Sequence, residues 1–190
     1  MTVNPKATKE FTIYVRVPNR TTSELYKPVP QVSGLKSLKV NGQSITPKIE
    51  NGYAAIKRSW KKGDKIELVL PMEIQKIKAD ENIEADKGRI ALRYGPLIYN
   101  VEAADQPNIE QSISKAPLSL EWRPQFLNGV MVIKGKWSDG TDLVAIPNYT
   151  RLNRTEPTDY PKAQVTQPAQ ANQPATKVSP SSIIWIKDEN

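Results

Sequence analysis

The sequence contains no cysteine and no histidine among its 190 residues. The absence of cysteine excludes disulfides, a thiol nucleophile and thiolate metal ligands. The absence of histidine removes the most common general base and the most common metal ligand. The chemistry available to this chain is therefore that of carboxylates, tyrosines, lysines and hydroxyls, and we predict no cofactor and no metal site.

Long apolar runs are absent as well. No stretch of about 18 apolar residues occurs, so we predict no membrane-spanning helix and no membrane partner. The N-terminal stretch "MTVNPKATKEFTIYV" has no apolar core and no cleavage pattern of a signal peptide.

The net charge of +7 comes from 27 Lys and Arg against 20 Asp and Glu. A basic chain can bind nucleic acid, but these charges are dispersed among apolar strand positions and turns. The sequence shows no recognition helix, no zinc finger and no basic stripe interleaved with aromatics. We therefore predict no nucleic-acid partner, and we interpret the lysines as protection of strand edges and as a source of solubility.

Alternation of apolar and polar residues dominates the sequence, and no long segment has helical periodicity. In "FTIYVRV", Phe11 to Val17, every second residue is apolar. Asn41-Gly42 lies between two strand-like runs and predicts a tight hairpin, because both central residues of the favoured turn need positive φ. Lys61-Lys62-Gly63-Asp64 predicts a second hairpin. Short strands with frequent turns favour an antiparallel sandwich over a parallel sheet.

Two changes in residue composition suggest how the chain is organised. Gly95-Pro96 interrupts an apolar run and is interpreted as a kink, and "QPNIEQSISKAP" after Asp105 as a domain boundary. We predict an all-β chain of two antiparallel β-sandwich (jelly-roll-like) domains in tandem, residues 1–105 and 106–190. The Pro/Gln-rich stretch at about 155–182 cannot bury enough apolar surface and is predicted to be a disordered insertion.

Several strings, in this order, resemble the non-catalytic part of glycoside hydrolase family 127, the β-L-arabinofuranosidase family. They are "FTIYVRVP", "VNGQ", "GYAAIKRSWKKGDKIELVLPM", "GRIALRYGPLIYNVEAAD", "IPNYTRLNR" and "IIWI". By this resemblance residues 1–105 are a middle-type β-sandwich and residues 106–190 a C-terminal one. Asn148 and Arg151 depart from the family, which tends to have aromatic residues at these positions.

The resemblance implies that catalysis resides in an α/α barrel absent from this sequence, where cysteines and a glutamate hold zinc. No catalytic residue can be carried over, because no barrel motif has a matching position. The implied partners are the catalytic barrel of the parent enzyme and a plant polysaccharide. The resemblance also suggests a bacterial polysaccharide-degrading system and a periplasmic or secreted location.

Glu102 and Asp105 form the most conspicuous pair of carboxylates. Paired carboxylates separated by a few ångströms act in many glycosidases. Strand-end acids also cap turns by accepting backbone hydrogen bonds, and in the resembled family this corner lies outside the barrel. We predict a structural corner here.

The four tryptophans are candidates for stacking on sugars. Trp60, beside a hairpin turn, and Trp185, inside an apolar run, are interpreted as core residues. Trp122 and Trp137 end strand-like runs beside polar residues and are less clear. Our candidate for a carbohydrate or interdomain contact combines four residues: Trp122, Tyr149, Asn153 and Arg154. The competing interpretation is that they pack the sandwich or face the absent barrel.

Asp139 and Asp142, around Gly140, could form part of a calcium site, but their spacing does not complete an EF-hand loop and equally suits a turn. The function we predict is that of an accessory, non-catalytic region of a glycoside hydrolase acting on L-arabinofuranoside-containing plant glycans. Two alternatives remain: a free-standing carbohydrate-binding module, and a small hydrolase that uses carboxylates alone. The accessory role predicts an exposed apolar patch where the barrel docks.

Overall fold

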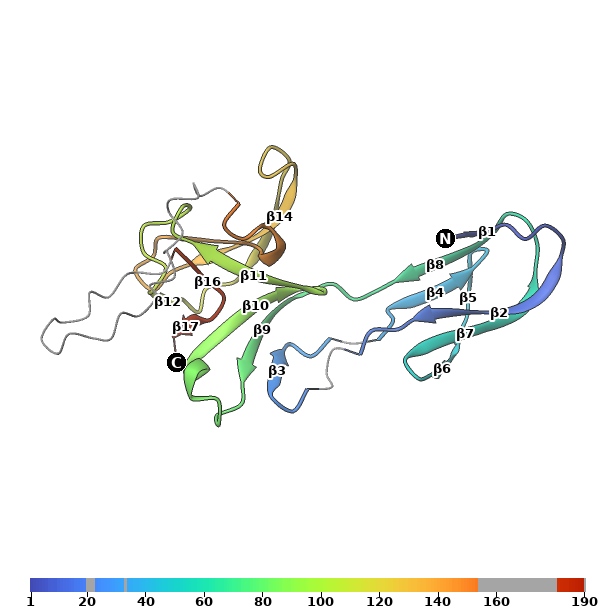
Figure 1. The fold of residues 1–190 in the computed structure, drawn as a ribbon, viewed down its shortest axis with the longest axis horizontal. Coiled ribbons are helices and arrows are strands. Elements are labelled where there is room, and N and C mark those ends of the chain that lie inside the picture. The colour runs from blue at the N-terminus through green and yellow to red at the C-terminus, as the bar shows by residue number, and fades with distance from the viewer. Residues whose placement is uncertain (20–22, 33, 154–180, 190) are drawn as a thin grey trace, which may run out of the picture. The chain divides into compact units, whose positions relative to one another are not determined.

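The computed structural model describes residues 1–19, 23–32, 34–153 and 181–189 (Figure 1). The described residues are nearly all β, as predicted, and include two single-turn 3₁₀ helices, η1 (Glu84–Asp86) and η2 (Asn148–Thr150). It forms two compact units, Met1–Glu73 (unit 1) and Ile74–Asn190 (unit 2). No helix of the described residues is long and apolar enough to cross a membrane.

Unit 1 is a sandwich of two antiparallel sheets, with strand orders β1-β8-β4-β5 and β2-β7-β6. The strands of these two sheets are β1 (Thr2–Val3), β2 (Lys9–Arg16), β4 (Ser37–Val40), β5 (Gln43–Ser44), β6 (Lys48–Glu50), β7 (Tyr53–Trp60) and β8 (Asp64–Val69). The short strand β3 (Tyr26–Val29) belongs to neither sheet. The core draws Leu38, Val40 and Ile66 from one sheet and Ile56 and Trp60 from the other. Alternation therefore places one face of each sheet in the core.

Tight turns connect these strands where the sequence predicted them. Asn41 and Gly42 have φ of 51° and 80°, the left-handed conformation of a two-residue hairpin, between β4 and β5. Gly63, with φ of 89°, ends the turn between β7 and β8. Trp60 is fully buried and its indole Nε1 donates to the Phe11 carbonyl at 3.0 Å, which confirms its prediction as a core residue.

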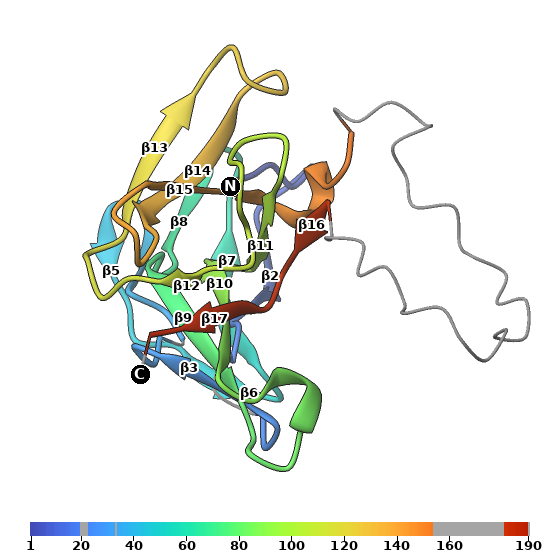
Figure 2. The same ribbon diagram turned by 90° about the vertical axis from the view of Figure 1, so that its left-hand side faces the viewer.

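Unit 2 is built on one curled sheet with the order β12-β17-β10-β11-β15-β14-β13, in which β9 also pairs with β10 and β16 with β11. Its strands are β9 (Ile74–Ala79), β10 (Arg89–Tyr94), β11 (Leu97–Glu102), β12 (Ser112–Ile113), β13 (Ser119–Arg123), β14 (Val130–Lys136), β15 (Asp142–Pro147), β16 (Ser182–Ile183) and β17 (Ile186–Asp188). All of these pairs are antiparallel except β12–β17. Figure 2 shows β13 and β14 as a long hairpin at one end of this order.

The main core of unit 2 lies on one face of the sheet and includes Leu92, Tyr99, Ile133, Trp137 and Ala145. Trp137, whose environment the sequence left open, is 1% exposed, and its indole Nε1 donates to Gln106 Oε1 at 3.1 Å. A smaller cluster around Val132 and Ile146 covers the opposite face.

Two details of the predicted organisation differ from the structure. Gly95-Pro96 is a two-residue hairpin turn, with Tyr94 opposite Leu97, and not a kink in one run. The compact units divide after Glu73 and not near Asp105. A division at Asp105 would cut a sheet, because β11 pairs with β15 and β16 farther along the chain. Nearly all of the predicted insertion at 155–182 lies outside the described residues, and Ser182 at its end belongs to β16.

Candidate carbohydrate or interdomain contact site

One end of the unit 2 sheet carries a row of apolar and aromatic residues. Directly opposite residues of an antiparallel pair point to the same face, and the printed pairs are Ile74 with Tyr94, Tyr94 with Leu97, Tyr99 with Pro147 and Trp122 with Met131. The β14–β15 ladder ends at Ile133 opposite Ala145, and two residues further along it would bring Met131 level with Pro147. The row thus crosses the sheet from β9 to β13.

Tyr99 holds the centre of this row. Its side chain is 1% exposed, and its hydroxyl donates to the Met131 carbonyl at 2.9 Å. The ladder between β14 and β15 does not continue here, since Pro147 has no N–H to donate. Burial, with smaller contributions from Tyr149 and Tyr94, raises the pKa of Tyr99 to about 12. The tyrosine therefore stays neutral and acts as a hydrogen-bond donor across the sheet.

Trp122 lies at the outer end of the row, on β13, and is 56% exposed. The Cζ2 atom of its indole is 2.8 Å from where a Cβ on Gly129 would stand, so the ring lies directly over that glycine. Gly129 has φ of 97°, a conformation that favours glycine. The glycine thus allows the hairpin to turn, and its lack of a side chain leaves room for one face of the indole ring. The rest of the ring is exposed to solvent.

Tyr149 lies at the same end, in η2, and is 69% exposed. Its segment follows β15 and is held from below by Glu102, whose Oε1 accepts the Leu152 N–H at 2.6 Å and the Asn100 amide at 3.2 Å. Glu102 is fully buried. Its carboxyl therefore fixes the corner that presents Tyr149.

A second anchor holds the same corner. Arg151 Nε donates to Ser182 Oγ at 3.0 Å, and a terminal nitrogen of its guanidinium donates to the Ser182 carbonyl at 3.2 Å. The Asn100 amide also donates to Ser182 Oγ at 3.1 Å. At Arg151, where the resembled family tends to have an aromatic ring, this chain uses a hydrogen-bonded guanidinium to tie η2 to β16.

The structure describes three of the four residues that the sequence suggested as a contact site. Trp122 and Tyr149 lie at the same end of the sheet, and Asn153 is exposed just after η2, with its N–H bonded to the Thr150 carbonyl at 3.4 Å. Arg154 lies outside the described residues. The sequence did not single out Tyr94, Leu97 and Tyr99 as their neighbours, because only strand register brings them into one row.

The pair Glu102 and Asp105 occupies a tight turn in which the Asp105 N–H bonds to the Glu102 carbonyl at 3.1 Å. Next to it, Gln106 is buried and bonds to β15 through both ends of its amide, donating to the Val144 carbonyl at 2.8 Å and accepting the Val144 N–H at 3.0 Å. The turn thus joins β11 to β15, which is the role of a structural corner.

Asp139 and Asp142 serve local structure. Asp139 accepts hydrogen bonds from the Thr141 hydroxyl and N–H, and Asp142 pairs with Lys136 at 2.7 Å. Hydrogen bonds from these partners lower the pKa of both carboxyls. Among the described residues, no group of three or more acidic side chains is arranged to hold a metal ion.

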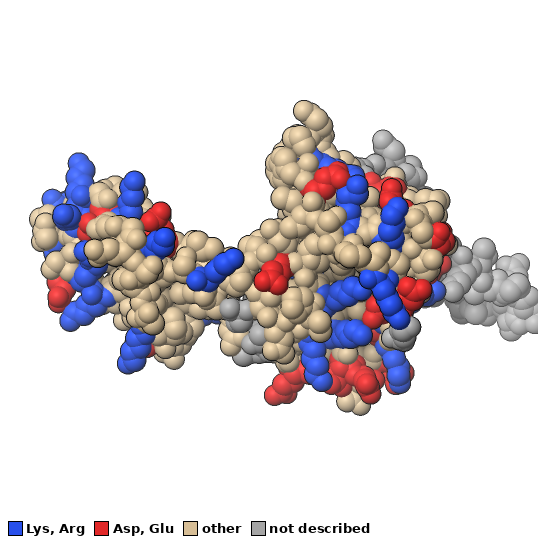
Figure 3. All heavy atoms as spheres, turned by 180° about the vertical axis from the view of Figure 1, so that it is seen from behind, with Lys and Arg blue, Asp and Glu red and all other residues tan. Residues whose placement is uncertain are grey.

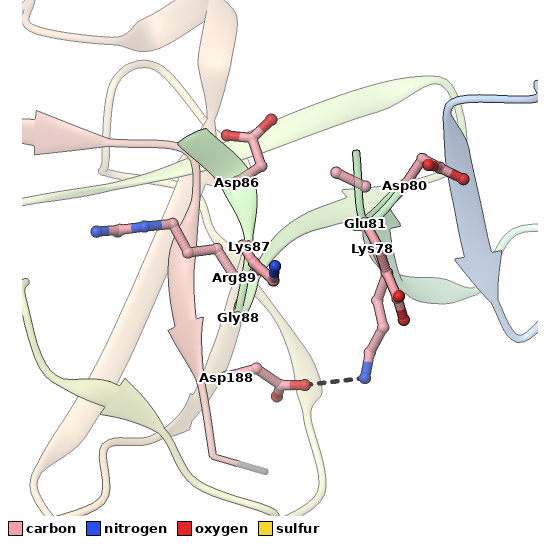
Figure 4. A pocket seen from close by; sticks show the side chains of 9 residues that line it. Lys78, Asp80, Glu81, Asp86, Lys87, Gly88, Arg89 and Asp188 are labelled. Carbon is pink, nitrogen blue, oxygen red and sulfur yellow. Dashed lines mark ion pairs between the residues drawn. The ribbon is translucent and has the colours of Figure 1, made fainter. Parts of the chain in front are cut away.

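A charged pocket of about 340 Å³ lies elsewhere in unit 2, between β9, η1 and β17 (Figure 4). Asp188 pairs there with Lys78 at 3.2 Å and with Lys76 at 3.9 Å. Arg89 donates to the Trp185 carbonyl at 3.0 Å. These contacts fasten β17 to its neighbours, and the pocket lining contains no aromatic ring on which a sugar could stack.

Comparison with known proteins agrees with this architecture. Residues 1–72 match the family described as "Beta-L-arabinofuranosidase, GH127 middle domain", and residues 74–159 match "Glycoside hydrolase family 127 C-terminal domain". The chain belongs to glycoside hydrolase family 127. The resemblance seen in the sequence is thereby confirmed, and the two family 127 matches meet where the two compact units divide.

Three known β-arabinofuranosidases are similar to this chain. It is 24% identical over 149 residues to a non-reducing end β-L-arabinofuranosidase of Bifidobacterium longum subsp. longum, covering 75% of this chain. A family 127 β-L-arabinofuranosidase from Geobacillus stearothermophilus T6 superposes on 99% of this chain with a TM-score of 0.72 and 26% identity. A second β-arabinofuranosidase of the family covers 96% with a TM-score of 0.74 and 23% identity, and shares the fold.

This chain corresponds to only part of those enzymes. It spans 21% of the length of the Bifidobacterium longum protein and 28% of each of these two solved structures.

Proposed function

We propose that this chain is the accessory, non-catalytic β-sandwich region of a glycoside hydrolase acting on L-arabinofuranoside-containing plant glycans. In this role it supports a catalytic barrel that belongs to the same enzyme. The observation that carries the proposal is the match to the middle and C-terminal domains of family 127 over nearly the whole described chain, with a quarter or so of the length of its relatives.

Exposed apolar side chains support a docking role. Of the fourteen large apolar residues exposed in the described chain, ten lie in unit 1. Scattered exposed apolar residues are ordinary, and it is a contiguous apolar surface among them that would mark a docking site.

A groove in unit 1 is the part of this surface best shaped for a partner. It has a volume of about 350 Å³, and its lining combines the apolar Val17, Leu35, Leu38, Ile45, Pro47 and Ile49 with the polar Lys36, Ser37 and Thr46. Ile49 is 50% exposed at its rim. An apolar side chain of the catalytic barrel inserted here would lose contact with water against the apolar part of this lining.

Two measurements test the accessory role. The purified chain should not hydrolyse aryl β-L-arabinofuranosides. In the native enzyme, amides of residues 45–49 should exchange with deuterium more slowly than in the isolated chain, because the barrel covers the groove. Hydrolysis by the isolated chain that Glu102→Gln abolishes would contradict the proposal and favour the small hydrolase. Equal exchange in both states would contradict the docking role of the groove.

The free-standing carbohydrate-binding module remains a second candidate because of Trp122 and Tyr149, both exposed at one end of the unit 2 sheet. It predicts a mobility shift of the chain in native gels that contain arabinan, and loss of that shift in Trp122→Ala. Leu25→Ala, which removes an exposed apolar side chain of unit 1, is the control. The absence of any shift with plant arabinans would count against this candidate.

A further inference from the structure

The net positive charge of the chain lies entirely in unit 1. Residues 1–73 contain 13 Lys and Arg against 6 Asp and Glu, whereas residues 74–190 contain 14 of each. Figure 3 shows Lys and Arg side chains spread over unit 1 with few acidic side chains among them, and the two kinds mixed over unit 2. The whole net charge of +7 therefore belongs to one compact unit.

Five lysines of unit 1 gather around one turn, which we call the lysine end: Lys6, Lys9, Lys61, Lys62 and Lys65. Strand register brings them together. Lys9 lies opposite Trp60, the residue before Lys61, and Lys65 lies opposite Thr2. Gly63 of the turn donates to the Val3 carbonyl at 3.1 Å and to Asn4 Oδ1 at 3.1 Å, which places the segment before Lys6 against the turn.

The ammonium groups of the lysine end are exposed, and none forms an ion pair with a described residue. The nearest acids are Asp64, in the same turn, and Glu10, beside Lys9. Asp64 is 2% exposed and accepts the Lys61 N–H and the Asn41 amide, each at 2.9 Å. Glu10 pairs with Lys57 at 3.4 Å. Five exposed cations around one buried carboxylate, Asp64, whose charge also acts on Lys61, leave a net positive potential that attracts a polyanion.

The chemistry of the lysine end indicates which polyanion it suits. Nucleic-acid surfaces use exposed aromatic rings for stacking or a helix in a groove. The aromatic rings here are the buried Trp60 and the half-buried Phe11, and the described part of unit 1 contains no helix. Lysine ammonium groups are point charges on flexible stems and need no bidentate partner, so they can follow carboxylates spaced along a flexible chain.

We propose that the lysine end binds acidic polysaccharide of the polyuronate class, which would hold the enzyme on carboxylate-rich plant glycans beside its neutral arabinofuranoside substrate. This inference rests on the proposed function for the choice of a plant glycan. The binding itself depends only on unit 1 and requires no catalytic domain.

The test measures binding of the full 190-residue chain to polygalacturonate by biolayer interferometry at low and at physiological salt. The triple variant K9Q/K61Q/K62Q removes three charges from the lysine end. The matched control K27Q/K36Q/K115Q removes three exposed lysine charges elsewhere. We expect the first variant to bind roughly 10- to 100-fold more weakly than the control, because each lysine near an anionic surface contributes a similar amount to the free energy of binding. Binding should also weaken as salt rises.

Fully methyl-esterified polygalacturonate, which has the same backbone without charge, should not bind. The proposal is overturned if polygalacturonate does not bind at low salt, or if both triple variants weaken binding equally, which would mean that only net charge matters. Tighter binding to a DNA duplex than to polygalacturonate would also overturn it. A chain that fails this test can still be an accessory region, and a chain that passes it can lack a catalytic partner, so the two proposals fail separately.

Discussion

Unit 1 and unit 2 are both antiparallel β structures, but they place their polar and apolar groups in opposite ways. Unit 1 carries all of the net charge and most of the exposed apolar side chains. Unit 2 is electrically neutral and buries a polar network of Asn100, Glu102, Gln106 and Ser182 between its strands. The surface of unit 1 is suited to binding partners, whereas the buried polar groups of unit 2 hold its own strands together.

This contrast indicates which groups determine the arrangement of the strands in each unit and which groups remain available for binding. A buried polar network is costly wherever a member lacks a partner, as the Asn100 Oδ1 atom does among the described residues, so it tolerates few arrangements of the strands. A sandwich core of aliphatic side chains fixes the fold with less demand on geometry and leaves the surface free to vary. We therefore expect core substitutions to act within one unit and surface substitutions to act on binding.

The largest expected effect is that of Trp60→Ala in unit 1. The change removes a fully buried indole and its bond to the Phe11 carbonyl, and should destabilise unit 1 by about 3–5 kcal/mol. Hydrogen exchange followed by mass spectrometry would resolve the two units, and peptides of unit 2 should keep their protection. Trp122→Ala, at a half-exposed indole, is the control. Equal loss of protection in both units would show that they unfold as one.

The next effect is that of Glu102→Ala in unit 2, which leaves the Leu152 N–H and the Asn100 amide without their buried acceptor. We expect a loss of about 2–3 kcal/mol in unit 2, with faster exchange at Leu152 and no change in unit 1. Glu84→Ala removes a carboxyl of the same unit whose side chain is 80% exposed, and should be nearly neutral. An unaltered exchange rate at Leu152 would argue against the anchoring role of Glu102.

A smaller loss of stability is expected at Gly129, where two causes can be distinguished: backbone strain and contact with the Trp122 ring. Gly129→Ala forces an L residue to φ of 97° and puts its Cβ against the Trp122 ring, at a cost of about 2 kcal/mol. Gly140→Ala, with φ of 84° and open space around it, should cost about 1 kcal/mol. Chemical unfolding measures both. If the double variant Gly129→Ala/Trp122→Ala is no better than the sum of its parts, the ring does not rest on Gly129.

The smallest effects should appear at the extremes of pH, on opposite sides for the two units. Hydrogen bonds from the Lys61 N–H and from Asn41 lower the pKa of Asp64 below 3.8, so its contribution to unit 1 is present above that pH and is lost as pH falls through the folded value. Tyr99, with a pKa raised to about 12, contributes to unit 2 below pH 10, and this contribution is lost between about pH 10 and 12. Unfolding of Asp64→Asn and Tyr99→Phe across pH should show flatter profiles in these windows. A parent-like profile in either variant would contradict the assignment.

The local structure of unit 1 followed from its sequence because alternation and turn residues decide it. Asn41-Gly42 and Gly63 require positive φ, and the strands beside them could be read directly. The same reasoning failed at Gly95-Pro96, where a hairpin was taken for a kink. The polar stretch after Asp105 was then taken for a boundary, since nothing local indicates that Tyr99 lies opposite Pro147.

The candidate site was predictable only in part for the same reason. Trp122 and Tyr149 stood out as aromatic residues beside polar ones, but their placement at one end of a sheet depends on register across four strands. Glu102 was expected to be structural, yet its partner Leu152 is 50 residues away along the chain. Long-range pairings of this kind have no signature in a single sequence.

The most direct test of the accessory role is the composition of the native species that carries this chain in its source cells. Native gel electrophoresis with immunoblotting and mass spectrometry of the detected band would identify every polypeptide segment present. We predict a species much larger than 21.3 kDa that contains a family 127 catalytic barrel and hydrolyses arabinofuranosides. A species of about 21.3 kDa, without a barrel and without activity, would contradict the accessory role and make glycan binding by the free sandwiches the leading explanation.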